Sequence, residues 1–140
     1  MSELRIEHIA VWARDLERLR EFYVSALHGE SGSLCVNQRT GFRSYFISFG
    51  GESRLELMSR PGDHSPQDGG GGNALGYAHV AFQLSSREAV DSMVASLEGQ
   101  GVVVLGSPRL TGDGYYEAVV ADPEGNRIEL AGPASSRTKG

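Results

Sequence analysis

The sequence predicts an α+β fold made of two tandem βαβββ modules, and three observations lead to it. A segment around His8 recurs around His79, and a segment around Glu56 recurs around Glu129, at offsets of 71 and 73 residues. Both copies place strand-like and helix-like segments in the same order. Glycine contributes 19 of the 140 residues, which suits many tight turns and disfavours a helix bundle.

The repeat is visible in two pairs of short segments. Residues 6–11 (IEHIAV) are similar to residues 77–82 (YAHVAF), and residues 54–57 (RLEL) are similar to residues 127–130 (RIEL). Two independent matches at nearly one offset indicate a duplicated module of about 70 residues.

The chain length and the repeat together predict one domain spanning residues 1–140. The modules are expected at about 4–60 and 75–132. Residues 61–76, which contain four consecutive glycines, are expected to be a flexible linker. Residues 133–140 are polar and are expected to form a frayed tail.

In the first module, residues 6–11 are short, apolar and bounded by polar residues, which predicts a strand. Asp15 is the expected cap of the following helix, whose apolar stripe ends at Gly29. Three further strands are predicted at 33–36, 43–49 and 54–58.

In the second module, residues 77–82 predict the first strand. Ser85 and Glu88 match the capping box that begins a helix, and Gly99 and Gly101 are expected to end it. The remaining strands are predicted at 102–105, 115–121 and 127–131, with a strong turn at 122–126 (DPEGN).

Charge and composition exclude several classes of protein. The net charge is −5 and no basic stripe is present, so we expect no nucleic-acid partner. No apolar run approaches the roughly 18 residues of a membrane span, and no secretory signal is visible, so we expect no membrane partner. A single cysteine allows no internal disulfide. These features predict a cytoplasmic protein that acts on a small molecule.

Four side chains at repeated positions form a candidate metal site: His8, Glu56, His79 and Glu129. A single strand histidine is usually an ordinary core residue, and a single glutamate is usually solvated. Strand alternation, however, places each of the four on a face where they could converge. Two imidazoles and two carboxylates suit a divalent cation such as Zn, Ni, Co, Mn or Fe(II), and the carboxylates neutralise its charge.

The βαβββ repeat, the His and Glu of each half, and residues 122–130 (DPEGNRIEL) resemble the vicinal oxygen chelate superfamily, closest to glyoxalase I (lactoylglutathione lyase). The resemblance covers about residues 4–131. It implies an open, U-shaped, eight-stranded barrel around a metal, with Ni or Zn favoured, and a homodimer with sites at the interface. It also implies Glu129 as the catalytic base and Glu56 as the second carboxylate ligand and a further candidate proton acceptor.

The resemblance further implies a lyase or isomerase that removes a proton next to a carbonyl by enediolate chemistry. Glyoxalase I usually has an arginine four residues after the first ligand and an asparagine four residues after the first glutamate, both for glutathione. Here those positions are Trp12 and Arg60, so the substrate contacts are expected to differ. Tyr115 and Tyr116 are further substrate-binding candidates, of which alternation allows only one to face the site.

Other members of the same superfamily offer alternative functions. An acyl-CoA epimerase would use the same combination of a metal and a base. An Fe(II) ring-cleaving dioxygenase normally uses two histidines and one glutamate, so Glu56 counts against it. A metal-free binding protein of the bleomycin-resistance type normally lacks the ligands, so retention of all four counts against that class.

Overall fold

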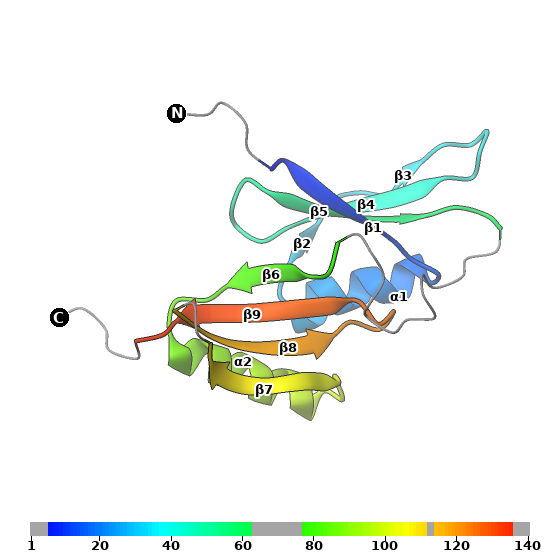
Figure 1. Ribbon diagram of the computed structural model, residues 1–140. Helices are drawn as coiled ribbons and strands as arrows, with labels where there is room; N and C mark the ends of the chain where they lie inside the picture. Colours follow the sequence, from blue (N-terminus) through cyan, green and yellow to red (C-terminus); the bar gives the residue numbers. More distant parts are fainter. Residues whose placement is uncertain (1–5, 63–76, 112–113, 136–140) are drawn as a thin grey trace. The chain divides into compact units, whose positions relative to one another are not determined.

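We describe the fold from a computed structural model, which defines residues 6–62, 77–111 and 114–135. The chain divides into two compact units, Met1–Ser65 and Pro66–Gly140. Each unit has its own sheet and its own helical segment (Figure 1). The predicted α+β class with two successive modules is confirmed. The greater part of the expected linker and of the expected tail lies outside the described residues.

The first unit forms a mixed sheet with one helical segment. Its strands lie in the order β1-β5-β4-β2, with β3 also pairing with β4; β1 is parallel to β5, and β4 is antiparallel to β5. The elements are β1 (His8–Trp12), α1 (Leu16–Glu21), the π-helical turn η1 (Phe22–Ala26), β2 (Glu30–Ser31), β3 (Cys35–Val36), β4 (Arg43–Ser48) and β5 (Arg54–Ser59).

The second unit repeats this arrangement. Its sheet has the order β6-β9-β8-β7, with β6 parallel to β9 and the other neighbours antiparallel. The elements are β6 (Val80–Gln83), α2 (Arg87–Gly99), β7 (Val104–Leu110), β8 (Tyr115–Ala121) and β9 (Arg127–Pro133).

Helix starts follow the predicted chemistry in one unit and differ by one residue in the other. The carboxylate of Asp15 accepts a hydrogen bond from the Arg18 amide at 3.1 Å, so the predicted cap of α1 is confirmed. In the second unit the cap is Ser86 and not Ser85. Ser86 has the extended backbone of a capping residue, and its hydroxyl accepts from the Ala89 amide at 3.0 Å.

The single strand expected at 33–36 is confirmed only at 35–36, where β3 lies. Two short strands replace it, and both pair with β4, so the described sheets contain nine strands and not eight. Gly32 still donates to the Phe46 carbonyl at 2.9 Å, after which the chain leaves the sheet until Cys35. The break between β2 and β3 depends on how each pairs with β4, and the sequence pattern does not specify that pairing.

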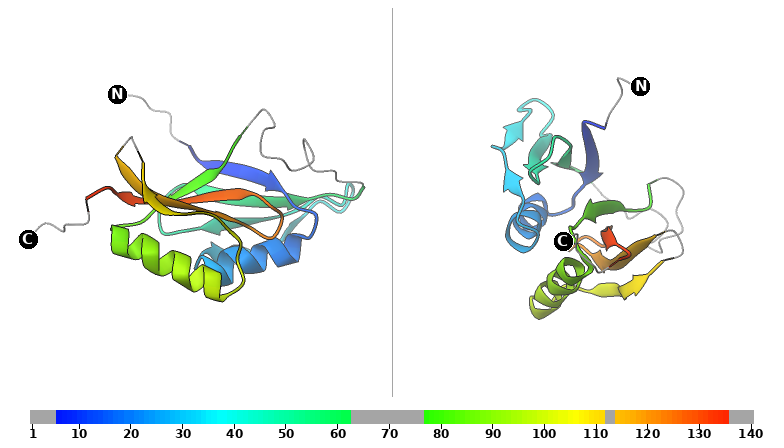
Figure 2. Two further views of the ribbon diagram at one scale, coloured as in Figure 1. Left: turned by 60° about the horizontal axis from the view of Figure 1, so that its bottom comes forward. Right: turned by 90° about the vertical axis from the view of Figure 1, so that its left-hand side faces the viewer.

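Each sheet has one face covered by its helix and one face without it, as Figure 2 shows for both units. In β5, Leu55 and Leu57 are buried towards the helical side, which leaves Glu56 on the other face. In β9, Ile128 and Leu130 are buried against α2, which leaves Glu129 on the other face. Burial of alternate apolar residues therefore orients both glutamates.

Within the part of the chain that the structure describes, no helix is long and apolar enough to cross a membrane.

Candidate functional site

The first unit brings His8 and Glu56 together. Residue Ala10 of β1 lies opposite Glu56 of β5, so His8 is one step along the same face of the parallel pair. His8 Nε2 lies 3.6 Å from Glu56 Oε1. The Glu56 side chain is 14% exposed and that of His8 is 40% exposed, so the carboxylate is the more enclosed of the two.

The second unit builds the same pair from its own strands. His79 comes immediately before β6, in which Ala81 lies opposite Glu129 of β9. His79 Nε2 lies 3.3 Å from Glu129 Oε1, and the two side chains are 40% and 21% exposed. The predicted repeat of a histidine with a glutamate is thus present as a repeated spatial pair.

The separation between the histidine nitrogen and the glutamate oxygen in the second unit suits a shared cation. In both units this separation is longer than a good hydrogen bond between nitrogen and oxygen. Two ligands about 2.1 Å from one metal ion, at tetrahedral or octahedral angles, are roughly 3.0–3.4 Å apart. The 3.3 Å of the second unit lies in this range, and the 3.6 Å of the first unit is slightly longer. Neutral imidazole nitrogen and carboxylate oxygen are also the donor types that Zn, Ni, Co and Mn accept. The donor set of each unit therefore fits a divalent cation.

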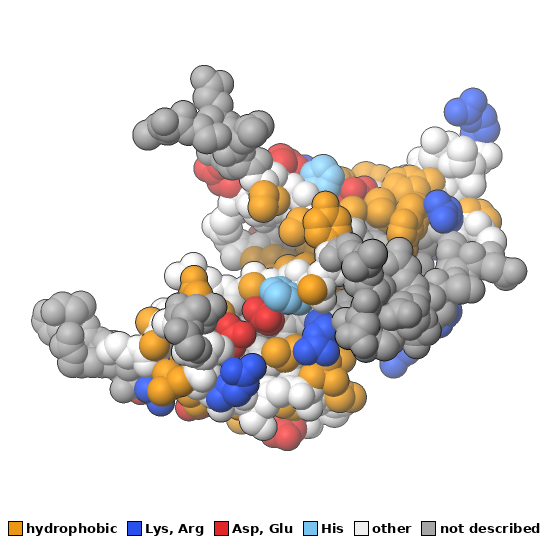
Figure 3. Space-filling view, in the orientation of Figure 1, with side chains coloured by type: hydrophobic (Ala, Val, Ile, Leu, Met, Phe, Trp, Pro, Cys, Tyr) orange, Lys and Arg blue, Asp and Glu red, His pale blue; other side chains and the backbone are white. Residues whose placement is uncertain are grey.

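Among the described residues, no three or more of His, Cys, Asp and Glu gather into one group that could hold a metal. The structure thus presents the four predicted ligands as two pairs, one in each unit. Their union in a single site stays a prediction. Figure 3 shows exposed histidine side chains with acidic and hydrophobic side chains near them.

Trp12 and Arg60, the two positions that depart from the glyoxalase I pattern, stack on each other. The Arg60 guanidinium carbon lies 4.2 Å from the centre of the Trp12 ring, within the range of a cation–π interaction. Trp12 is 46% exposed and also meets Phe42 edge-on, with ring centres 6.4 Å apart. Trp12 lies on the same face of β1 as His8.

The two candidate tyrosines lie on opposite faces of β8. Tyr116 points to the helix side, where its hydroxyl donates to Asp91 at 2.7 Å and Arg87 lies over its ring. Asp91 raises the pKa of Tyr116, chiefly through this hydrogen bond. Tyr115 lies opposite Pro133, on the face that carries Glu129. Tyr115 is therefore the one that remains a substrate-binding candidate.

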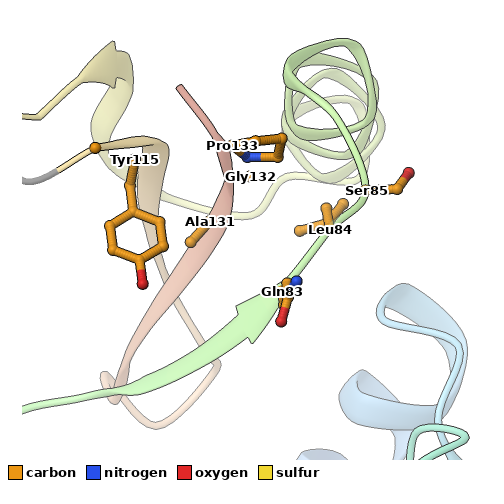
Figure 4. Close-up of a pocket in the computed structure, with 8 residues that line it drawn as sticks. Gln83, Leu84, Ser85, Tyr115, Ala131, Gly132 and Pro133 are labelled. Carbon is orange, nitrogen blue, oxygen red and sulfur yellow. The ribbon is translucent and has the colours of Figure 1, made fainter. Parts of the chain in front are cut away.

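A hollow of about 430 Å³ adjoins Tyr115 in the second unit. It lies at the ends of β6, β8 and β9, and Figure 4 shows Tyr115, Ala131 and Gln83 coming from these three neighbouring strands. Ala131 is two residues beyond Glu129 on the same face of β9, so the hollow begins one step along the strand from Glu129, which does not line it. The lining residues are Gln83, Leu84, Ser85, Gly114, Tyr115, Ala131, Gly132 and Pro133, none of which carries a charge.

Sequence reasoning missed Glu7, which lies directly beside His8, the first predicted ligand. Its carboxylate is 2.6 Å from His8 Nδ1 and 2.8 Å from the Arg54 guanidinium. The hydrogen bond with His8, supported by that with Arg54, lowers the pKa of Glu7. Its position next to His8 in the sequence was the available signal, but the pairing of β1 with β5 is needed to supply Arg54.

Residues 5–130 match the family model of the Glyoxalase/Bleomycin resistance protein/Dioxygenase superfamily. The chain belongs to this superfamily. The matched region contains both His–Glu pairs and nearly all of the two described sheets.

A curated relative, the uncharacterized protein YqjT of Bacillus subtilis (strain 168), is 35% identical over 63 residues. The match spans 43% of this chain and 49% of YqjT, so it covers about half of either protein.

Several solved structures share the fold over nearly the whole chain. A glyoxylase/bleomycin resistance protein/dioxygenase domain from Frankia sp. EAN1pec has a TM-score of 0.78 at 16% identity, covering 94% of this chain and 99% of that one. The trypanothione-dependent glyoxalase I of Leishmania major has a TM-score of 0.73 at 23% identity, with 93% and 87% covered. TnmS3, an antibiotic binding protein from Streptomyces sp. CB03234, has a TM-score of 0.71 at 25% identity, with 95% and 98% covered.

Proposed function

We propose that the chain is a divalent-metal-dependent lyase or isomerase of the glyoxalase I type. The observation that carries the proposal is the repeated pair: a histidine nitrogen and a glutamate oxygen, 3.6 Å apart in one unit and 3.3 Å apart in the other. His8, Glu56, His79 and Glu129 would hold the metal, with Ni or Zn favoured. When bound, the cation would act as a Lewis acid towards a carbonyl of the substrate.

The chain's own residues supply the proton transfer. Glu129 accepts a proton from the carbon next to the carbonyl and returns it to the neighbouring carbon, so the reaction is an isomerisation with no net redox change. Glu56 offers a second carboxylate of the same kind. Both side chains are mostly enclosed, which limits the water that competes for their oxygens.

The rest of the substrate has two places to bind. The stacked side chains of Trp12 and Arg60 offer an aromatic surface and a cation in the first unit. The uncharged hollow beside Tyr115 begins two residues from Glu129 in the second unit and suits a neutral group. A homodimer with shared sites is compatible with this proposal. The acyl-CoA epimerase reaction is a compatible variant, since it would use the same metal and base.

Metal content tests the proposal. Protein stripped of metal and then loaded with Ni or Zn is expected to hold about one ion per chain, and His79→Ala is expected to lose it. The matched control is His28→Asn, because His28 belongs to neither pair and has a backbone φ of 65° that asparagine tolerates. Unchanged metal binding in His79→Ala would overturn the site.

A second candidate function is the binding of an aromatic small molecule without chemistry. The likeness to the antibiotic binding protein TnmS3 and the exposed aromatic face of the first unit favour it. Absence of bound metal, together with tight binding of an aromatic ligand in a calorimetric titration, would favour this function over the enzyme. An Fe(II) dioxygenase is a weaker alternative because its pattern leaves Glu56 without a role.

A further inference from the structure

The two histidines differ in what holds their second ring nitrogen. Glu7 Oε1 lies 2.6 Å from His8 Nδ1. An ionised carboxylate only accepts hydrogen bonds, so His8 Nδ1 must carry the proton in this contact. The neutral ring then has its lone pair on Nε2, the nitrogen that faces Glu56 at 3.6 Å.

Neighbouring side chains fix both the carboxylate and the ring. Arg54 donates to the other oxygen of Glu7 at 2.8 Å, and its guanidinium lies 4.1 Å from the centre of the Phe46 ring. The His8 ring meets the same Phe46 edge-on, with centres 5.3 Å apart and planes at 88°. Glu7, Arg54 and Phe46 therefore restrict the His8 ring from more than one side.

The second unit has no equivalent carboxylate. The residue before His79 is Ala78, and among the described residues His79 has Glu129 as its ionic partner and no acidic residue at Nδ1. The matching position of Arg54 is Arg127, so the repeat keeps the arginine and loses the acid that would join it to the histidine.

We propose that Glu7 is a positioning residue that fixes His8 in the Nδ1–H tautomer and directs Nε2 towards the metal. A carboxylate behind a ligating histidine orients the ring and raises its strength as a ligand. The two halves of the site are thereby unequal: His8 is held at both ring nitrogens, whereas among the described residues His79 has Glu129 at Nε2 and no acidic residue at Nδ1. The metal-binding part of this inference rests on the proposed function, and the tautomer does not.

The first test measures the tautomer in metal-free protein, by long-range ¹H–¹⁵N NMR of the imidazoles at alkaline pH. We expect His8 to show the Nδ1–H form in the wild type and in Glu7→Gln, whose amide oxygen still accepts the hydrogen bond. We expect Glu7→Ala to shift His8 towards the Nε2–H form and to leave His79 unchanged. An unaltered His8 spectrum in Glu7→Ala would overturn the proposal.

The second test measures Zn affinity by competition with a chelator. Loss of such a partner typically weakens a metal site by about 10–100-fold, so Glu7→Ala is expected to fall in this range and Glu7→Gln to lose less. Glu98→Ala on α2 is the matched control, because it removes the same charge from an exposed position in the other unit. Equal affinities in Glu7→Ala and Glu98→Ala would contradict the assigned role.

The two proposals fail in different ways. If the wild type holds no metal, the proposed function fails, while the tautomer of His8 still decides the role of Glu7. If metal binds but neither the tautomer nor the affinity responds to Glu7→Ala, only the role of Glu7 fails.

Discussion

Trp12 and Arg60 meet because of where they stand on two parallel strands. Each lies four residues after a predicted ligand, Trp12 after His8 on β1 and Arg60 after Glu56 just beyond the end of β5. Four residues of strand advance by about 13 Å, and parallel strands advance in the same direction. The two substitutions relative to the glyoxalase I pattern therefore fall at one place, where they form a single cation–π stack.

This stack predicts weak or absent turnover of the hemithioacetal of methylglyoxal and glutathione. Trp12 brings no charge to a glutathione carboxylate. Arg60 replaces the asparagine of the glyoxalase I pattern, and its guanidinium lies against the Trp12 ring. Turnover is measured with Ni- or Zn-loaded protein by the absorbance of the thioester product. The double variant Trp12→Arg/Arg60→Asn is expected to raise it, and robust turnover by the wild type would contradict the prediction.

At the scale of the elements, the orientation of Glu56 and Glu129 depends on close packing of the opposite face of each sheet against its helix. In the second unit, α2 begins directly over β9. A Cβ added at Gly132 would lie 2.9 Å from the Ser86 carbonyl oxygen and 3.1 Å from Val90 Cγ2. A glycine is needed there because the capped start of the helix approaches the strand backbone too closely for a side chain.

Gly132→Ala is therefore expected to destabilise the fold by about 1–3 kcal/mol, the usual cost of overpacking. The matched control is Gly99→Ala at the end of α2, where an added Cβ meets nothing within 4 Å. Alanine suits a helix better than glycine, so this variant is expected to be neutral or to stabilise by up to about 1 kcal/mol. Urea unfolding measures both free energies; equal values for the two variants would show that the close approach is relieved by backbone movement.

At the scale of the whole molecule, both units join the helix to the sheet through a tyrosine and a carboxylate. Tyr45 of β4 donates to Glu17 of α1 at 2.7 Å, and Tyr116 of β8 donates to Asp91 of α2 at 2.7 Å. In each case the hydrogen bond with the carboxylate is the main cause that raises the pKa of the tyrosine. The same connection thus recurs in the two halves of the chain.

The raised pKa values predict loss of stability in alkali. The folded chain keeps these two protons at pH values where the unfolded chain releases them, so their contribution is complete below about pH 10 and is lost as the pH rises through the folded pKa values. Urea unfolding at pH 8 and at pH 10.5 should show a larger decline for the wild type than for Tyr45→Phe/Tyr116→Phe. An equal decline in both proteins would assign the alkaline loss to other groups.

Much of the fold was predictable because its strongest signals are local. The predicted strand 115–121 agrees with β8 to the residue. The turn after it is fixed by Asp122, which accepts hydrogen bonds from the amides of Glu124 and Asn126 at 2.9 Å. The short strands β2 and β3 were not predictable, because each has two residues and is defined only by its pairing with β4. Adjacent serines likewise led the prediction to Ser85, one residue before the true cap of α2 at Ser86.

The sequence by itself determined the duplicated module and the residues of both His–Glu pairs, because a repeat and a period of two are properties of the chain order. Only the tertiary structure decided which tyrosine of β8 lies on the face that carries Glu129, and that Trp12 and Arg60 stack. It also decided that Glu7 and Arg54 meet at His8. These contacts join residues up to 48 positions apart, and their distance in space depends on strand register, which no local pattern specifies.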